Sequence, residues 1–114
     1  MILLSLSTNC LLCFLYIVTI SIRSFARTWT VELKQRKIRV NAISPGPIDT
    51  PGFNGLAQSE EQIEQIKTSQ VATVPMGRMG SPHEVAKAVS FLASDDSSFV
   101  TGIELFVDGG QAQI

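Results

Sequence analysis

The sequence is poor in the side chains that build metal centres, disulfide frameworks and nucleic-acid interfaces. Its 114 residues include two cysteines and one histidine. Cys10 and Cys13 are too few for a disulfide framework, and no second cysteine pair or histidine cluster exists to complete a zinc site. Charged residues make up 17% of the chain, and nine basic against ten acidic side chains give a net charge of −1. This balance predicts no nucleic-acid partner and no acidic or basic tail.

Hydrophobic residues are plentiful, at 45% of the chain, which excludes intrinsic disorder. A chain of this length fits one domain of modest size. Cys10 and Cys13 lie among leucines without a basic neighbour to stabilise a thiolate, so we interpret them as buried hydrophobic side chains. His83 falls in the first turn of an expected helix and is interpreted as a surface residue. A reducing compartment is the default expectation.

The first 22 residues carry no charged side chain, and sixteen of them are apolar or aromatic. As a helix this segment would reach about 33 Å, against roughly 30 Å for a hydrocarbon layer. Asn9 would need a polar partner in lipid, so we favour a buried or atypical apolar segment. A membrane anchor or signal segment is the alternative. Residues 16–22 fit either a β-strand or an extension of the following helix.

Hydrophobic periodicity beyond this segment predicts a helix followed by a strand. Residues 22–37 have a helical period, with Phe25, Trp29 and Leu33 on one face that we expect to enter the core. Residues 38–43 alternate between apolar and polar side chains and predict a short strand that ends in a Pro-Gly-Pro turn.

Two further helices and a second strand are expected in the rest of the chain. Residues 60–71 predict a polar helix, interpreted as a mobile lid between glycine-containing loops. Ser81 and Glu84 have the spacing of a capping box at the start of the next helix. That helix carries an apolar stripe expected to face the core: Val85, Ala88, Val89 and Leu92. Residues 103–107 predict the second strand. The order indicates an α/β crossover with two parallel strands.

The turn after the first strand is the most informative segment. Open α/β sheets bind ligands at the carboxyl ends of their parallel strands. Gly46 has no Cβ, so a flat ring could approach the backbone, and Pro45 limits the conformations of the loop. The main chain around Ile48 and the Thr50 hydroxyl offer donors and acceptors suited to a carboxamide. From the residues alone, a rigid surface turn is the favoured interpretation and a ligand-binding edge is the alternative.

Three ordered blocks resemble the C-terminal portion of the short-chain dehydrogenase/reductase family. The run IRVNAISPGPIDT at residues 38–50 is similar to the signature that follows the sixth strand of that family. Residues 75–86 resemble its G-R-x-G-x-P-x-E-V-A block, and residues 91–110 resemble its last helix and strand. The resemblance implies an α/β fold: part of a Rossmann-like doubly wound parallel sheet over residues 23–114, preceded by an unrelated apolar segment over residues 1–22.

The resemblance also implies a chemistry. Complete members of the family transfer hydride between the nicotinamide of NAD or NADP and an alcohol or carbonyl of a small-molecule substrate. The implied cofactor contacts are Pro45, Gly46, Ile48 and Thr50. Residues 53–74 would cover the substrate, and Asp108 would be an architectural strand end. Complete relatives are expected to be homo-oligomers, and a cytoplasmic location is expected.

The family's catalytic and phosphate-binding motifs have no counterpart in the sequence. It contains no Gly-rich loop before Gly46 and no Tyr-x-x-x-Lys, because Tyr16 is followed four positions later by Ile20. We therefore assign no catalytic residue and expect a fragment that does not turn over alone. Two alternatives are a non-catalytic interaction partner of a full-length family subunit and a membrane-anchored module that uses residues 1–22.

Overall fold

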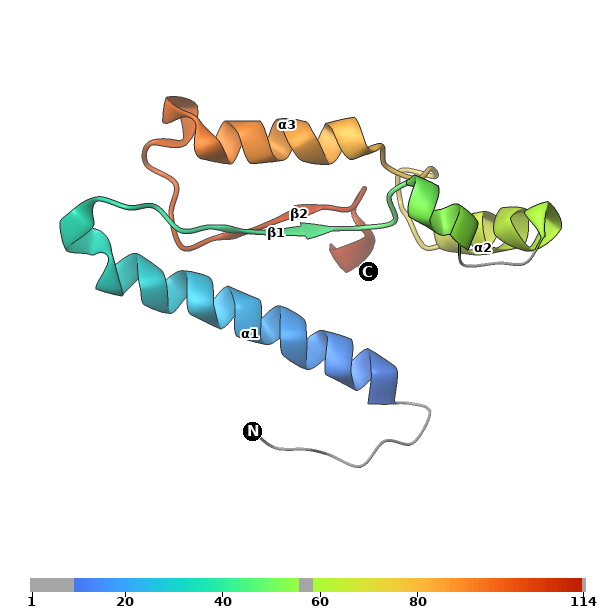
Figure 1. Cartoon of the computed structure of the whole chain (residues 1–114), viewed down its shortest axis with the longest axis horizontal. Helices are drawn as coiled ribbons and strands as arrows, with labels where there is room; N and C mark the ends of the chain where they lie inside the picture. Colours follow the sequence, from blue (N-terminus) through green and yellow to red (C-terminus); the bar gives the residue numbers. More distant parts are fainter. Residues whose placement is uncertain (1–9, 56–58, 114) are drawn as a thin grey trace. The chain divides into compact units, whose positions relative to one another are not determined.

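The structure is a computed structural model that describes residues 10–55 and 59–113. The helices and strands are, in chain order, α1 (Cys10–Glu32), β1 (Ala42–Pro45), α2 (Glu60–Ala72), α3 (Pro82–Ala93) and β2 (Glu104–Val107) (Figure 1). Short 3₁₀ turns lie at Lys34–Arg36, Pro51–Gly55, Asp95–Ser97 and Gln111–Gln113. The chain divides into two compact units, residues 1–42 with 101–104 and residues 43–100 with 105–114. The N-terminal residues 1–9, part of the predicted apolar segment, lie outside the described residues, as do the side chains of Cys10 and Cys13.

The two strands pair in parallel, which confirms the predicted crossover. The amide of Ala42 donates to the carbonyl of Ile103 at 2.9 Å, and the amide of Gly46 donates to the carbonyl of Val107 at 3.0 Å. Both pairs have the same offset along the chain, so the register is constant from one end of the ladder to the other. The carboxyl ends of β1 and β2 therefore lie side by side.

The boundaries of β2 agree with the prediction to within a residue, and β1 is present as predicted, but its predicted boundaries were wrong. Residues 38–43 were expected to form the strand, whereas β1 begins at Ala42. The amide of Val40 donates to the hydroxyl of Thr101 at 3.1 Å, so a side chain takes the place of a backbone acceptor there. Because that partner is far away in the chain, the local alternation of side chains could not reveal it.

Helix α1 includes residues 16–22, so the helical alternative for that segment holds. The predicted aromatic core face was wrong. Phe25 and Trp29 are 54% and 48% exposed, and their rings stack on each other with centroids 5.4 Å apart. Ala26 is the buried residue among those of α1 whose side chains the structure describes, residues 21–32, and the Thr30 hydroxyl donates back to its carbonyl at 2.8 Å. No helix among the described residues is long and apolar enough to cross a membrane.

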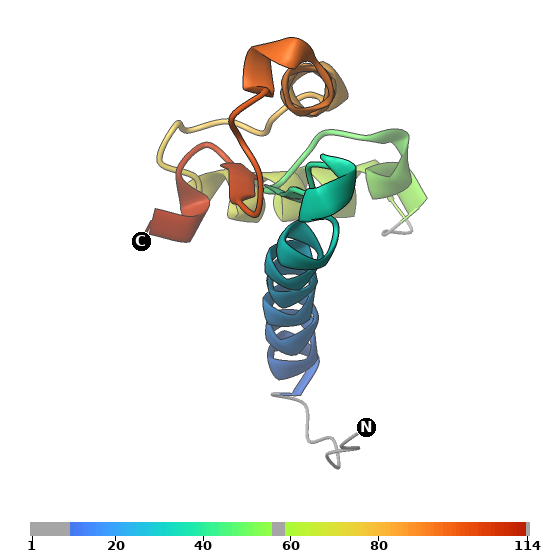
Figure 2. The same ribbon diagram turned by 90° about the vertical axis from the view of Figure 1, so that its left-hand side faces the viewer.

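Helix α3 begins as predicted. The Ser81 hydroxyl accepts from the Glu84 amide, and the Glu84 carboxylate accepts from the Ser81 amide, which completes the capping box. Figures 1 and 2 show α3 running along one side of the strands. The expected core stripe is wrong in part, because no residue of α3 is fully buried and Val89 is exposed. His83 is exposed, as predicted.

Helix α2 matches its predicted bounds closely and starts at the N-cap Ser59, whose hydroxyl accepts from the amide of Gln62 at 3.3 Å. Its role as a mobile lid stays a prediction.

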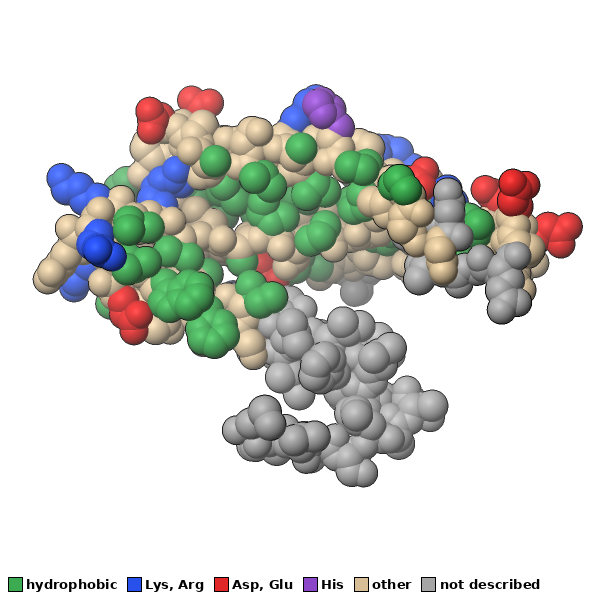
Figure 3. All heavy atoms as spheres, in the orientation of Figure 1, with side chains coloured by type: hydrophobic (Ala, Val, Ile, Leu, Met, Phe, Trp, Pro, Cys, Tyr) green, Lys and Arg blue, Asp and Glu red, His purple; other side chains and the backbone are tan. Residues whose placement is uncertain are grey.

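The buried hydrophobic core of the described residues is small: Ala26, Ala42 and Val74. Hydrophobic side chains are visible at the surface between α3 and the strands (Figure 3). Since apolar burial is the main favourable term in folding, so small a core predicts low stability for the chain by itself.

Candidate functional site

The predicted cofactor contacts lie in one loop that leaves the carboxyl end of β1. Gly46 packs tightly against Asp108, the residue that follows β2, because a Cβ built at Gly46 would lie 2.7 Å from both Cα and Cβ of Asp108. The missing side chain at Gly46 thus lets the two strand ends meet. The sequence-based interpretation gave the glycine a different reason, the approach of a flat ring.

Ile48 is held by a parallel β-bridge to Gly80. The amide of Gly80 donates to the carbonyl of Pro47 at 2.9 Å, and the amide of Asp49 donates to the carbonyl of Gly80 at 2.8 Å. Backbone groups of successive residues in extended chain point to opposite sides, so the N–H and C=O of Ile48 point away from Gly80. A Cβ on Gly80 would lie 2.7 Å from Cδ1 of Ile48, which shows how closely the two segments pack.

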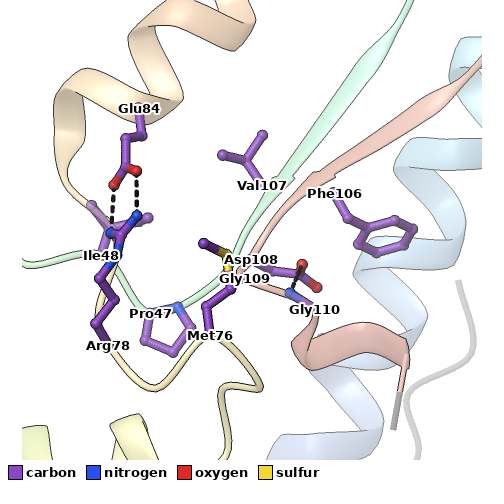
Figure 4. A pocket seen from close by; sticks show the side chains of 11 residues that line it. Pro47, Ile48, Met76, Arg78, Glu84, Phe106, Val107, Asp108, Gly109 and Gly110 are labelled. Atoms are coloured by element: carbon purple, nitrogen blue, oxygen red, sulfur yellow. Dashed lines mark hydrogen bonds and ion pairs between the residues drawn. The ribbon is translucent and has the colours of Figure 1, made fainter.

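Arg78 and Glu84 form a two-pronged ion pair beside this bridge (Figure 4). Arg78 Nη2 donates to Glu84 Oε1 at 2.7 Å, and Nη1 donates to Oε2 at 3.0 Å. The hydrogen bond from Arg78, followed by that from the Ser81 amide, lowers the pKa of Glu84 to about 2. The same hydrogen bond raises the pKa of Arg78. Both side chains are partly exposed, at 52% and 41%.

A second ion pair reaches the loop from α2. Lys67 Nζ lies 2.9 Å from Asp49 Oδ1. Asp49 stands between Ile48 and Thr50, so α2 is tied to the loop that carries two of the predicted cofactor contacts. Thr50 itself is half-buried just before the turn Pro51–Gly55.

A cleft of about 480 Å³ opens beside the loop. Its lining is mostly apolar and includes the Arg78–Glu84 ion pair. The lining residues are Pro47, Ile48, Met76, Arg78, Gly80, Glu84, Phe106, Val107, Asp108, Gly109 and Gly110. Of the predicted cofactor contacts, Ile48 belongs to this lining (Figure 4). The carboxylate of Asp108 accepts from the amides of Gly110 and Ala112 at 2.9 and 2.8 Å, as the expected architectural strand end would.

The structure thus keeps Pro45, Gly46, Ile48 and Thr50 together, and it adds two ion pairs that sequence reasoning missed. Glu84 was recognised as part of the capping box, but its pairing with Arg78 was not. Arg78 precedes the first residue of α3, so no helical spacing links it to Glu84. Among the residues described, no group of three or more His, Cys, Asp or Glu could hold a metal ion.

The family model for enoyl-(acyl carrier protein) reductase matches residues 17–112. The chain therefore belongs to the short-chain dehydrogenase/reductase family. The resemblance found in the three sequence blocks is therefore confirmed, as is the Rossmann-like α/β fold class. Oxidoreductases of this family work with NAD(P).

Curated relatives and solved structures agree with this assignment. A 3-oxoacyl-(acyl-carrier-protein) reductase FabG from Thermotoga maritima is 45% identical over 84 residues, which cover 74% of this chain and 32% of that protein. A glucose 1-dehydrogenase from Gluconobacter oxydans is 39% identical over 79% of this chain and 32% of its own length. The aldohexose dehydrogenase of Thermoplasma acidophilum, in a C-terminal deletion mutant, superposes with a TM-score of 0.73 at 33% identity, over 82% of this chain and 43% of its own. The chain thus spans about a third of the length of these curated relatives.

Proposed function

We propose that this chain supplies the nicotinamide-facing loop of an NAD(P)-dependent short-chain oxidoreductase, with Pro45, Gly46, Ile48 and Thr50 as cofactor contacts. One observation carries the proposal: the parallel bridge to Gly80 turns the N–H and C=O of Ile48 to the opposite side. A donor and an acceptor on one residue match the C=O and NH₂ of a carboxamide. The Thr50 hydroxyl adds a group that can either donate or accept.

The chemistry divides between cofactor and protein. The bound nicotinamide supplies or accepts the hydride exchanged with an alcohol or carbonyl. The residues of this chain bind and orient the carboxamide, and the β-bridge fixes the backbone that does so. Since the sequence holds neither a Gly-rich loop nor a Tyr-x-x-x-Lys, we expect the purified chain not to oxidise NADH or NADPH with any carbonyl substrate. Turnover by the purified chain would overturn this expectation.

Replacing Thr50 by valine tests the proposed contact. We expect reduced nicotinamide mononucleotide to bind the chain with a Kd on the order of 1 mM and to shift the amide resonances of residues 45–50. Thr50→Val should weaken this binding about threefold to tenfold, the net value of one hydrogen bond. Thr68→Val, on an exposed position of α2, is the matched control. Unchanged affinity in Thr50→Val, or shifts centred on other residues, would refute the assignment.

A non-catalytic role beside a full-length family subunit is the second candidate. It is favoured by the small buried core and by the exposed apolar side chains of α1 and α3, among them Trp29, Val31 and Val89. Association with a partner of the same family would cover such surface. Co-purification of the tagged chain with an intact family enzyme, but not with an unrelated dehydrogenase, would support it. Recovery as a stable monomer in the presence of that enzyme would argue against it.

We further propose a division of the chain and a location for the protein. We place the family-like part at residues 23–114 and the apolar segment at residues 1–22, and we place the protein in the cytoplasm. Recovery of the tagged protein in the membrane pellet after lysis would instead favour the anchored alternative.

A further inference from the structure

Gly80 is held on both sides by one ion pair. Arg78 Nη1 donates to the carbonyl of Met79 at 3.0 Å, directly before Gly80. The Ser81 amide, directly after Gly80, donates to Glu84 Oε2 at 2.8 Å. The guanidinium and the carboxylate meet each other in two hydrogen bonds. The turn from Arg78 to Glu84 is therefore closed around Gly80.

Gly80 in turn fixes the loop of the proposed cofactor contacts. Its amide and carbonyl bond Pro47 and Asp49, the two neighbours of Ile48. An unbroken series of hydrogen bonds thus runs from the Arg78–Glu84 pair through Gly80 to the backbone on either side of Ile48. Two-pronged pairs between guanidinium and carboxylate fix geometry more strictly than a single point charge does.

We propose that Arg78 and Glu84 are positioning residues that hold the Ile48 N–H and C=O in the orientation required for a carboxamide. This inference rests on the proposed function for its ligand, but its geometric part can be tested without any ligand. We assign the pair no direct contact with cofactor or substrate. Its effect passes through Gly80.

The test measures hydrogen exchange at two amides in the full chain, those of Asp49 and Gly80. Arg78→Met and Glu84→Gln should each raise both exchange rates about threefold, the scale of a partly exposed ion pair. The amide of Ala88, in the interior of α3, should not change. Arg78→Lys should restore protection in part, because an ammonium keeps the charge but not the fork. Lys87→Met, one turn beyond Glu84 on α3, is the matched control.

Ser81→Ala separates positioning from helix capping. It removes the hydroxyl that accepts from the Glu84 amide, and it leaves the Arg78–Glu84 pair and the backbone amide of residue 81 in place. We expect faster exchange in the first turn of α3 and unchanged exchange at Asp49. If Ser81→Ala and Glu84→Gln instead affect Asp49 equally, Glu84 acts only as a cap and the proposal is wrong.

Acid titration of the unmodified chain gives an independent measurement. The pKa of Glu84 is lowered from 4.5 to about 2. The stabilisation of the turn by the ionised Glu84 carboxylate is therefore complete above pH 4.5 and is lost as the pH falls towards 2. Protection of the Asp49 amide, corrected for intrinsic exchange, should therefore fall across that window. Glu84→Gln should show no such step. Asp108 lines the same cleft, His83 and Lys87 lie on α3, and Asp49 is paired with Lys67 of α2. Asp49→Asn is the control for an effect of acid on that ion pair.

Ligand binding separates this proposal from the proposed function. With reduced nicotinamide mononucleotide as the probe, Arg78→Met should raise the Kd by the same factor of about three. If the unmodified chain does not bind the probe, the proposed function fails, while the exchange rates still decide whether the pair orders the loop. Unchanged exchange at both Asp49 and Gly80 in Arg78→Met and Glu84→Gln would overturn the proposal in every case.

Discussion

Gly46→Ala is expected to lower the free energy of unfolding by about 2 kcal/mol, within the usual cost of overpacking a tightly packed position. The new Cβ would lie 2.7 Å from Cα and Cβ of Asp108, and a backbone atom cannot move aside without shifting the end of β2. Gly46 is not among the glycines with a positive φ, so the cost is one of space and not of backbone conformation. Urea denaturation followed by circular dichroism measures it.

Gly55→Ala is the matched control. A Cβ at Gly55 would meet no heavy atom of the described residues within 4 Å, and Gly55 also lacks a positive φ. Both substitutions reduce the entropy of the unfolded chain by a similar amount, so their difference isolates the contact with Asp108. Equal stability of the two variants would mean that the strand ends do not approach as the structure has them.

The start of α3 could be predicted because its signal lies within a few residues of sequence. Ser81 and Glu84 are three residues apart, and the hydrogen bonds that join them depend on that spacing alone. The loop after β1 was likewise recognisable, because proline and glycine restrict the backbone wherever they occur. Features of this kind can be found without knowing what lies across the fold.

Other failures have a different cause, since they depended on contacts between parts of the chain that are distant in sequence. The start of β1 was predicted too early because Val40 bonds the hydroxyl of Thr101. The ion pair of Asp49 with Lys67 joins a loop to a helix whose relative placement no local pattern reports. Periodicity identified the apolar face of α1 around Trp29, but burial depends on what packs against that face. In the described chain nothing buries it fully.

Gly109→Ala is expected to have the larger effect on stability, about 3 kcal/mol, because two costs add at one position. Gly109 has a φ of +63°, a left-handed conformation that costs roughly 1–2 kcal/mol for a residue with a side chain. A Cβ there would also lie 2.6 Å from Cγ1 of Val74, which is 6% exposed and belongs to the small core. Urea denaturation again measures the change.

Two further variants separate the costs at Gly109. Gly77 has a similar φ of +70°, but its Cβ would meet no described atom within 4 Å, so Gly77→Ala should show the backbone cost alone. Val74→Ala removes Cγ1 and with it the close contact. The double variant Val74→Ala/Gly109→Ala should therefore lose about 1 kcal/mol less free energy of unfolding than the two single variants lose together. Strict additivity would show that the turn after β2 does not press on Val74. Equal losses in Gly77→Ala and Gly109→Ala would show that backbone conformation accounts for the whole effect.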